Sequence, residues 1–374
     1  MKKNIKMGLF VAVLVMAQGL LPTRTAAQQP NKAVIAYYAG SAEALDSFDM
    51  RTITHLIYCF GHLKGNEFKL DSRADTVLMQ KMVALKKKNP QLKVLLSLGG
   101  WGGCETCSPV FSTRQGRSAF ARSVDRAIRY FGADGIDLDW EYPTIAGYRS
   151  HPFAPGDKAA FTALLQELRN TLGTRRVITF AAGGFQHYLD NAVDWTAAMK
   201  YVDYVNLMTY DFVSGAATTT GHHTALYSTA SQKESTDNCV KALVKKGVSP
   251  QKMIIGAAFY ARTWNGVSAA NKGLYQSGTF KDYIGYNEFS QRLARDSGYV
   301  FYWDTIAQGP YAYNETNQTF ATFDDKRSLQ LKTEYVLANN LGGIMFWELS
   351  HDTALDGLLH QINTTLRQPP KKEN

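Results

Sequence analysis

The chain has 374 residues, of which 45% are hydrophobic, 12% aromatic and 20% charged, with a formal net charge of +9 at pH 7. This composition excludes disordered, collagen-like and coiled-coil proteins, and the length allows one large barrel as readily as two ordinary domains. The longest basic runs, at 86–88 and 245–246, lie near predicted helix ends and form no concentrated stripe. We therefore expect both runs to be solvent-exposed, where they suit the helix dipole, and expect no nucleic-acid partner.

Residues 1–27 have the pattern of a cleaved export signal. Three lysines precede an apolar stretch at 7–21, and small residues follow as far as Ala27. An uncleaved membrane anchor is the alternative, but glutamine, glycine and proline interrupt and shorten the apolar stretch. Cleavage after Ala27 would remove four basic residues and no acidic ones, which lowers the charge from +9 to +5. We expect a secreted or periplasmic protein that is not associated with a membrane after cleavage.

Eight short apolar runs follow in chain order, and each is bounded by glycine, aspartate or proline. Amphipathic helical patterns lie between several of them, for example at 120–131 and at 161–172, where Gly173 predicts the helix end. Eight alternating units favour a closed parallel (β/α)₈ barrel, or TIM barrel, with its chemistry at the carboxyl ends of the strands. An open doubly wound sheet is the alternative, although no Gly-x-Gly-x-x-Gly follows the first run. The runs are 34–38, 55–60, 94–98, 135–140, 177–182, 202–208, 253–260 and 343–348.

The interval before the last run is roughly twice the usual length of a barrel unit. Residues 264–322 within it are rich in aromatic residues separated by glycine and asparagine, which predicts a small α+β insertion between strands seven and eight. A helical pattern at 326–340 then leads into strand eight. We expect one catalytic barrel over 28–374 that contains this insertion on its active face, and a frayed polar tail at 368–374.

Two of the four cysteines form the motif Cys104-Glu-Thr-Cys107, which allows three interpretations. It is typical of a local disulfide, of a redox motif, or of half a zinc site. No second ligand pair with zinc-finger spacing follows, and the glycine-rich approach is unlike a strand that enters a thioredoxin-like helix. We favour the disulfide, and we expect Cys59 and Cys239 to be buried thiols.

The segment 134–143, Asp-Gly-Ile-Asp-Leu-Asp-Trp-Glu-Tyr-Pro, is the most informative in the chain. A strand with period 2 places Asp137, Asp139 and Glu141 on one face, about 7 Å apart along the backbone. Repulsion among like charges raises at least one pKa and favours a carboxyl that stays protonated at neutral pH, as a general acid requires. Asp134 has the opposite parity, so we assign it a structural role at the start of the strand.

A divalent-metal site is the alternative interpretation of these clustered carboxylates. Such a site needs further ligands at neighbouring strand ends, but those ends are mostly aromatic. Sugar rings stack on aromatic side chains through their C–H faces, so carboxylates beside them indicate cleavage of a glycosidic bond. We expect no metal and no other cofactor. The strand-end residues are Tyr37, Phe60, Gly99, Trp101, Met208, Tyr210 and Trp347.

These motifs resemble those of the family 18 glycoside hydrolases, the chitinases, along nearly the whole mature chain. The pattern Asp134-x-x-Asp137-x-Asp139-x-Glu141 matches the family signature without departure. The predicted insertion is also similar to the α+β insertion of the subgroup with deep clefts. Further matching segments are Ser97-Leu-Gly-Gly-Trp101, Met208-Thr-Tyr-Asp211, Tyr260-Ala-Arg262 and Met345-Phe-Trp-Glu348.

The resemblance implies that the substrate's own acetamide is the nucleophile. Glu141 would protonate the leaving oxygen and later deprotonate the incoming water. Asp139 would accept a hydrogen bond from the acetamide N–H and share a proton with Asp137, while Tyr210 would hold the acetamide carbonyl.

The resemblance also implies sugar-binding residues. Asp211 and Arg262 would contact sugar hydroxyls and Trp347 would form the floor of the cleavage subsite. The alternatives are a strand end that satisfies its own backbone for Tyr210 and Asp211, and a surface ion pair for Arg262. Further candidates for substrate contact are Tyr37, Phe60, Trp101, Tyr142, Met208 and Trp264, of which Trp101 and Trp264 could pack loops instead.

The sequence therefore predicts an exported, monomeric, retaining hydrolase that cleaves β-1,4-linked N-acetylglucosamine in chitin or chitooligosaccharides. An endo-β-N-acetylglucosaminidase acting on glycoprotein glycans is an alternative, although Trp140, Tyr142 and the insertion favour a chitinase. A chitin-binding lectin is a second alternative, but lectins of the family usually lack the acid, and Glu141 is present.

Overall fold

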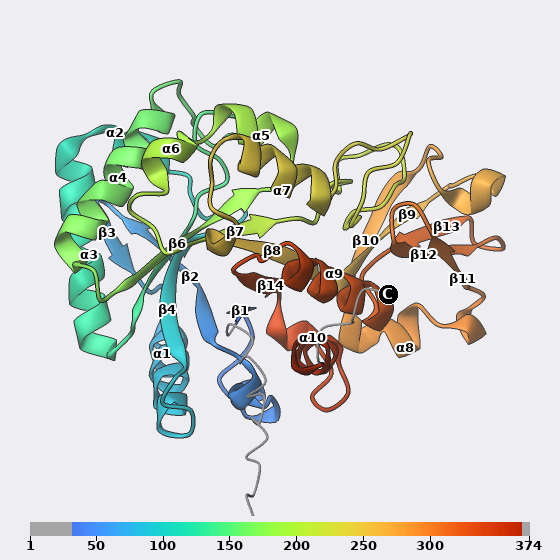
Figure 1. Cartoon of the computed structure of the whole chain (residues 1–374), viewed down its shortest axis with the longest axis horizontal. Helices are drawn as coiled ribbons and strands as arrows, with labels where there is room; N and C mark the ends of the chain where they lie inside the picture. The colour runs from blue at the N-terminus through green and yellow to red at the C-terminus, as the bar shows by residue number, and fades with distance from the viewer. Residues whose placement is uncertain (1–31, 369–374) are drawn as a thin grey trace, which may run out of the picture. The chain divides into compact units, whose positions relative to one another are not determined.

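The computed structural model describes residues 32–368, and its centre is a closed barrel of eight parallel strands (Figure 1). The strands follow the order β1-β14-β8-β7-β6-β5-β4-β2, and β2 pairs with β1 to close the ring. The predicted (β/α)₈ barrel is confirmed, and the alternative of an open doubly wound sheet is wrong. The barrel strands are β1 (Ala33–Tyr38), β2 (His55–Lys64), β4 (Lys93–Gly99), β5 (Gly135–Asp139), β6 (Val177–Gly183), β7 (Tyr204–Met208), β8 (Met253–Ala258) and β14 (Gly343–Trp347).

The described residues begin one residue before β1 and end one residue after the last helix. The predicted export signal at 1–27 and the tail beyond residue 368 lie outside them. Within residues 32–368, no helix combines the length and the apolar character that crossing a membrane requires.

Residue alternation decides which side chains of each strand face the inside of the barrel. On β1, Val34, Ala36 and Tyr38 belong to the apolar cluster that includes the surrounding helices, whereas Ile35 and Tyr37 belong to a separate cluster within the barrel. This is the period of two expected for a strand with both faces buried. The same alternation places Tyr37 inside the barrel near the carboxyl end of its strand.

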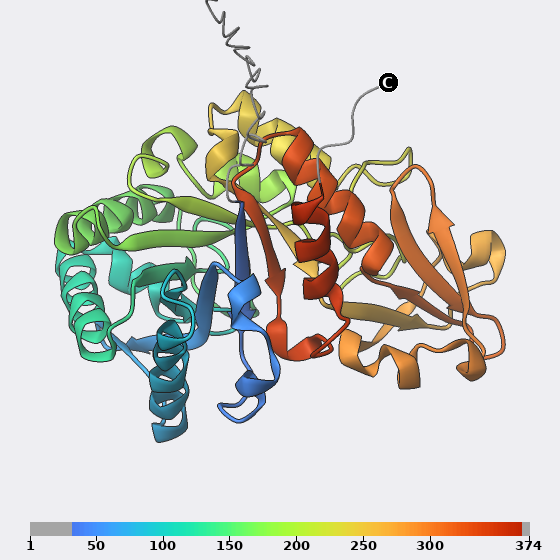
Figure 2. The ribbon, with the colours of Figure 1, turned by 60° about the horizontal axis from the view of Figure 1, so that its bottom comes forward.

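Helices cover the outside of the barrel, and α9 and α10 lie side by side next to β14 (Figure 2). The side chain of Thr113 caps α3 by accepting from the backbone N–H of Gly116 at 3.0 Å. The predicted stop at Gly173 is the C-cap of α4, where a φ of 70° is reached without the clash of a side chain. The helices are α1 (Arg73–Ala84), α2 (Cys107–Ser112), α3 (Arg114–Phe131), α4 (Asp157–Leu172), α5 (Gln186–Asn191), α6 (Trp195–Ala198), α7 (Thr236–Lys245), α8 (Phe289–Arg292), α9 (Lys326–Ala338) and α10 (Leu358–Arg367).

Between β8 and β14 the chain forms a separate five-stranded antiparallel sheet, as the predicted insertion requires. Its first strand begins at Tyr260, ahead of the expected start at Trp264, because the chain passes from β8 into the sheet with only Phe259 between them. A short strand that was not predicted, β3 (Glu67–Lys69), also forms a hairpin by pairing antiparallel with the end of β2. The inserted sheet has the order β10-β9-β13-β12-β11, with β9 (Tyr260–Asn265), β10 (Thr279–Gly285), β11 (Val300–Asp304), β12 (Gly309–Asn314) and β13 (Thr319–Thr322).

Cys104 and Cys107 are joined by a disulfide, with Cα atoms 5.1 Å apart. It joins the loop after β4 to the first residue of α2. Cys239 is a buried free thiol, whereas Cys59 is a free thiol that is only half-buried on β2. The expectation of a buried thiol is thus met only in part for Cys59, whose side chain packs against the cluster that contains Tyr37.

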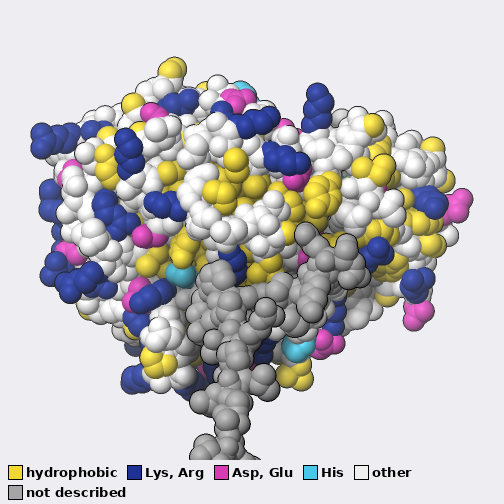
Figure 3. All heavy atoms as spheres, in the orientation of Figure 1, with side chains coloured by type: hydrophobic (Ala, Val, Ile, Leu, Met, Phe, Trp, Pro, Cys, Tyr) yellow, Lys and Arg dark blue, Asp and Glu magenta, His cyan; other side chains and the backbone are white. Residues whose placement is uncertain are grey.

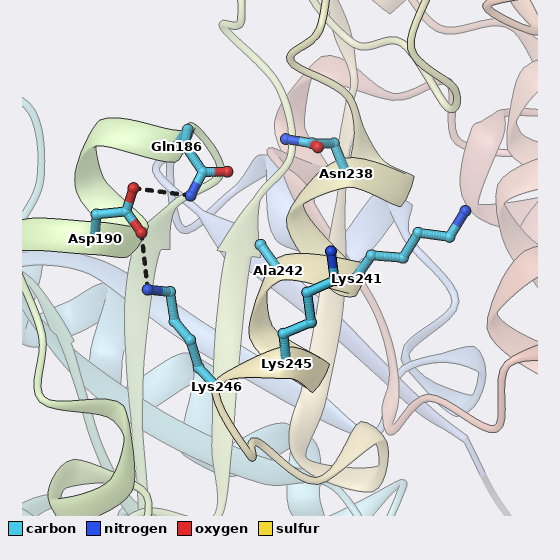
Figure 4. A pocket seen from close by; sticks show the side chains of 7 residues that line it. All are labelled: Gln186, Asp190, Asn238, Lys241, Ala242, Lys245 and Lys246. Atoms are coloured by element: carbon cyan, nitrogen blue, oxygen red, sulfur yellow. Dashed lines mark hydrogen bonds and ion pairs between the residues drawn. The ribbon is translucent and has the colours of Figure 1, made fainter.

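The basic residues are scattered over the face shown in Figure 3 and form no continuous stripe on it. The sequence predicts that Lys86 is solvent-exposed, but in the structure it forms an ion pair. Its ammonium lies 2.8 Å from Asp134 Oδ2. The same carboxylate accepts from the backbone N–H of Val94 at 2.9 Å, so Asp134 joins the starts of β4 and β5. Lys245 and Lys246 line a pocket between α5 and α7, where Lys246 pairs with Asp190 at 2.8 Å (Figure 4).

A buried ion pair fixes the place where the chain returns from the insertion to the barrel. Lys332 of α9 and Asp324 are both inaccessible to solvent, with 2.7 Å between Nζ and Oδ2. Asp324 also accepts from the Thr224 hydroxyl at 2.9 Å and from the Ala258 backbone N–H at 3.0 Å. The carboxylate therefore links the end of β8 to the start of α9.

We predict that Asp324→Ala lowers the free energy of unfolding by about 3–5 kcal/mol, because Lys332 is then a buried charge without its partner. The double variant Asp324→Leu with Lys332→Met should lose much less, since no charge stays buried. Chemical denaturation of the three proteins measures this, and equal losses in the single and double variants would contradict it.

Candidate active site

Strand β5 places the clustered acids inside the barrel mouth. Asp137 and Asp139 are buried on β5, and Glu141 lies two residues beyond its end. Ile136, Leu138 and Trp140 alternate with them and pack outward in the cluster that includes the helices. The structure thus gives the acids the common face that the period of the strand predicts.

Asp137 is the most strongly hydrogen-bonded of the three acids. Its Oδ1 accepts from Thr179 Oγ1 at 2.5 Å and from Asn206 Nδ2 at 3.2 Å. Its Oδ2 accepts from Ser97 Oγ at 2.9 Å and from the Tyr37 hydroxyl at 3.1 Å. Burial raises the pKa of Asp137, but these four donors favour the ionised form and oppose that rise. Asp137 is therefore held in one orientation below the other two acids.

Asp139 is only 4% exposed, and its Oδ1 has no hydrogen-bond partner among the described residues. Burial raises the pKa of Asp139 well above its usual value, and the charges of Glu141 and Asp137 raise it further. An unpaired buried carboxylate oxygen is costly in a folded protein. Its presence here indicates a position that is ready to receive a proton or a donor from a ligand.

Burial raises the pKa of Glu141 to about 7, with a smaller contribution from the charge of Asp211 and an opposing hydrogen bond with Tyr142. The sequence argument gave repulsion within the acidic cluster as the cause, whereas burial is the larger effect here. A carboxyl with a pKa near 7 is protonated in a large fraction of molecules at neutral pH. It can therefore donate a proton and recover it within one reaction cycle.

Tyr210 follows β7, and the charges of Asp139 and Glu141 act on its hydroxyl. Its side chain is 9% exposed, and its hydroxyl lies 3.9 Å from the sulfur of Met345. Burial raises the pKa of Tyr210, and the charges of Asp139, Asp211 and Glu141 raise it further, which they can do only at short range. The Tyr210 hydroxyl is therefore neutral and is a donor near the acidic group.

Asp211 and Arg262 form a bidentate ion pair between the barrel and the inserted sheet. Arg262 Nε and Nη2 lie 2.5 and 2.6 Å from the two carboxylate oxygens of Asp211, and the Tyr260 hydroxyl donates to Oδ1 at 2.6 Å. Burial alone would raise the pKa of Asp211, but the nearby His223 and the hydrogen bonds from Arg262 hold it well below its usual value. Asp211 is thus a negative charge beside Glu141. Arg262 pairs with this site residue and not with a surface acid.

The candidate aromatic residues form two groups. The ring of Trp347 stacks on Phe60, with centroids 5.6 Å apart and an interplanar angle of 11°, and lies 6.1 Å from the ring of Tyr37. Trp101 is 60% exposed, and its ring centroid lies 6.4 Å from that of Tyr142. Of these rings, Tyr37 is buried and Trp101 is exposed. Met208, at the end of β7, is half-buried and packs against the cluster inside the barrel.

Trp264 does not belong to the site. It is 0% exposed, packs among aromatic residues of the inserted sheet, and donates its indole N–H to the carbonyl of Ala217 at 3.0 Å. The expected sugar contact is therefore wrong. The loop after β7 covers the ring, which makes Trp264 part of the core of the insertion.

Several residues around the site were not singled out from the sequence. Thr179 and Asn206 donate to Asp137, His223 lies 3.5 Å from Asp211, and the ring of Tyr188 packs 5.2 Å from that of Tyr142. A polar residue at an inward position of an apolar strand was the signal available for Thr179 and Asn206. His223 follows a loop and had no such signal. Within residues 32–368, no group of three or more histidine, cysteine, aspartate or glutamate side chains is arranged to hold a metal ion.

We predict that Asp139→Asn changes how stability depends on pH. The raised pKa of Asp139 means that the folded protein binds a proton more tightly than the unfolded chain, so this group costs stability as the pH rises from about 4 through its folded pKa. Asparagine removes that cost, so the melting temperature of the variant relative to wild type should be higher at pH 8 than at pH 4. Calorimetry at both values tests this, and a constant difference would contradict it.

Comparison with known proteins identifies relatives along almost the whole described chain. Chitinase A1 of Niallia circulans is 33% identical over 292 residues, which is 72% of this chain and 42% of that protein. Chitotriosidase-1 of Mus musculus is 30% identical over 348 residues, which is 86% of this chain and 72% of that protein. The present chain thus spans less than half of the length of the bacterial relative and about three quarters of the mouse protein.

A solved structure of a family 18 N-acetylglucosaminidase from Paenibacillus barengoltzii is 36% identical, with a TM-score of 0.82 over 90% of this chain and 100% of that one. The model of the family described as Glycosyl hydrolases family 18 matches residues 33–352. This match includes the barrel, the inserted sheet and every acid described above. The chain belongs to glycoside hydrolase family 18.

Proposed function

We propose that the protein is a chitinase, which hydrolyses β-1,4 bonds between N-acetylglucosamine units in chitin or its oligosaccharides. The observation that carries this proposal is that two features occur in one site: Glu141 has a pKa of about 7, and a buried oxygen of Asp139 has no hydrogen-bond partner among the described residues. The acid supplies a proton, and the carboxylate can accept a hydrogen bond from an N–H of the substrate. Chitinase A1 and chitotriosidase-1, which are similar over most of this chain, support the same substrate.

The proposed reaction uses the acetamide of the substrate as the nucleophile. Its carbonyl oxygen attacks the anomeric carbon while Glu141 gives its proton to the glycosidic oxygen, and the bond to the leaving sugar breaks. Asp139 accepts from the acetamide N–H and offsets the positive charge of the oxazolinium-like intermediate. Ionised Glu141 then takes a proton from water, whose oxygen attacks the same carbon and releases the acetamide with retention of configuration.

Tyr210 and Asp137 support this reaction in the proposal. The Tyr210 hydroxyl makes only a long contact with Met345 among the described residues, so it remains available to donate to the acetamide carbonyl and hold it for attack. Asp137, fixed by its four donors, shares a proton with Asp139 during the cycle. Trp347 and Phe60 supply stacked ring faces for the sugar at the cleavage subsite, and Trp101 supplies one further out.

An N-acetylglucosaminidase that releases single sugars is the second candidate, because the solved enzyme with that activity is 36% identical over its whole length. The endo-β-N-acetylglucosaminidase and the chitin-binding lectin are the remaining alternatives. We also propose export and a secreted or periplasmic location for a monomer, on the pattern of residues 1–27 alone.

We predict that Glu141→Gln lowers turnover of an N-acetylglucosamine hexamer by at least ~10²-fold without changing the fold, because it removes the proton donor. In the wild type, the rate should fall as the pH rises above about 7, since Glu141 then loses its proton. Chromatography of the products over a pH series measures both. Products of several lengths support a chitinase, and single sugars alone support the second candidate.

The matched control is Lys245→Gln, a change in the pocket between α5 and α7. This variant should turn over the hexamer at the wild-type rate. Full activity in Glu141→Gln would overturn the assignment of the acid. Release of glycans from a glycoprotein without cleavage of the hexamer would favour the endo-β-N-acetylglucosaminidase, and hexamer binding without any cleavage would favour the lectin.

We predict that an oligomer without the acetyl group at the cleavage subsite resists hydrolysis, because the nucleophile is then missing. Tyr210→Phe should lower turnover of the acetylated oligomer by less than Glu141→Gln does, since it removes positioning and leaves the proton donor in place. Rapid cleavage of the deacetylated bond, located by mass spectrometry of the products, would refute acetamide participation.

A further inference from the structure

A chain of contacts outside the acidic cluster connects the inserted sheet to the end of the last barrel strand. The hydroxyl of Tyr283, on β10, lies 2.8 Å from His351 Nδ1. His351 ends a short 3₁₀ helix, η8 (Leu349–His351), which follows β14, and its Nε2 lies 3.4 Å from Glu348 Oε1. The contact therefore joins two segments that are 68 residues apart in the sequence.

On the barrel side, this series of contacts ends at residues that several hydrogen bonds hold in place. Glu348 is 3% exposed, and its Oε2 accepts from the backbone N–H groups of Ala39 and Ser350, each at 3.1 Å. The Ser350 hydroxyl donates to Oε1. Glu348 thus ties the end of β1 to the turn after β14, and His351 is held in a fixed place relative to the barrel.

The insertion end of the chain leads directly to the candidate active site. The ring of Tyr283 stacks on that of Tyr260, with centroids 4.6 Å apart and an interplanar angle of 27°. Tyr260 in turn donates its hydroxyl to Asp211 at 2.6 Å. Tyr283 also lies opposite Arg262 in the register of β9 and β10, and Arg262 is the bidentate partner of the same carboxylate.

The hydrogen bonds of Tyr260 and Arg262 to Asp211 come from the insertion, so the insertion needs a fixed position relative to the barrel. A second hydrogen bond, from Asn287 Nδ2 to the Ser350 carbonyl at 3.0 Å, closes the same contact but lies on the exposed rim. Tyr283 is the member that touches both η8 and the stacked Tyr260. Misplacement of reacting groups by about 1 Å can cost up to ~10²-fold in rate, so such a contact matters for turnover.

We propose that Tyr283 and His351 are positioning residues, which hold Tyr260 and hence Asp211 in place at the cleavage subsite. The proposal rests on the proposed hydrolysis of N-acetylglucosamine oligomers. Neither residue needs to contact the sugar, because both act through the Tyr260 ring and hydroxyl. Their loss changes how often Asp211 and its neighbours reach the reactive arrangement, and it leaves the outer aromatic surface around Trp101 intact.

The test uses Tyr283→Phe, which keeps the stacked ring and removes the bond to His351, and His351→Leu, which removes its other end. Both should lower kcat on the hexamer by about 3- to 30-fold while KM stays within about 2-fold. His351→Asn should recover most of the rate, because its amide can again bond the Tyr283 hydroxyl. Tyr313→Phe is the matched control: it removes a 2.7 Å hydroxyl bond to the Val267 carbonyl in the same sheet and should leave kcat unchanged.

A double-variant comparison separates positioning from a general loss of stability. If Tyr283 acts through Tyr260, adding Tyr283→Phe to Tyr260→Phe should lower kcat no further. Independent, multiplicative losses would overturn the proposal, as would an equal loss of kcat in Tyr313→Phe or no recovery in His351→Asn.

Hydrogen exchange of the β9 backbone amides provides a readout that does not need activity. Exchange should rise in Tyr283→Phe and His351→Leu and stay at the wild-type level in Tyr313→Phe. Wild-type protein that fails to cleave the hexamer would refute the proposed function, and the exchange measurement would then decide whether the contact holds the sheet. Unchanged exchange in both variants would overturn the positioning role.

Discussion

The site depends on the burial of carboxyl groups at the open end of the barrel. Strand β5 places Asp137 and Asp139 on one inward face, and Glu141 follows with the same parity. Four donors satisfy Asp137, whereas Asp139 keeps an oxygen without a partner, and burial raises the pKa of Glu141 to about 7. Three groups of the same chemistry are thus given different protonation behaviour by their surroundings alone.

The insertion is part of this electrostatic arrangement. Arg262, from the inserted sheet, keeps Asp211 ionised, and the charge of Asp211 helps to raise the pKa of Glu141 on the barrel. The position of β9 relative to the barrel therefore affects the pKa of Glu141 as well as the packing of the structure. The buried pair of Asp324 and Lys332 fixes the return of the insertion, and the contact of Tyr283 with His351 fixes its other side.

Much of this molecule could be predicted from its sequence because strand alternation is a local property. All eight barrel strands coincide with apolar runs, and the parity of 134–141 separates the inward acids from Asp134 without any tertiary information. Trp264 shows where local reasoning fails. An aromatic residue in an aromatic-rich segment can face a ligand or a core, and only the loop that carries Ala217 decides that this ring is covered.

The register between strands explains why the hydrogen bonds around Asp137 could not be predicted from the sequence. Ser97, Asp137 and Thr179 are direct partners across β4, β5 and β6, so their side chains meet in one layer of the barrel interior. The sequence shows three polar residues at inward positions of separate apolar runs, but not that they lie at the same height. The height of each strand follows from the tilt and stagger of the closed barrel, which are set by packing of all eight strands together. The hydrogen bonds that distinguish Asp137 from Asp139 are therefore a property of the whole barrel and cannot be read from any one strand.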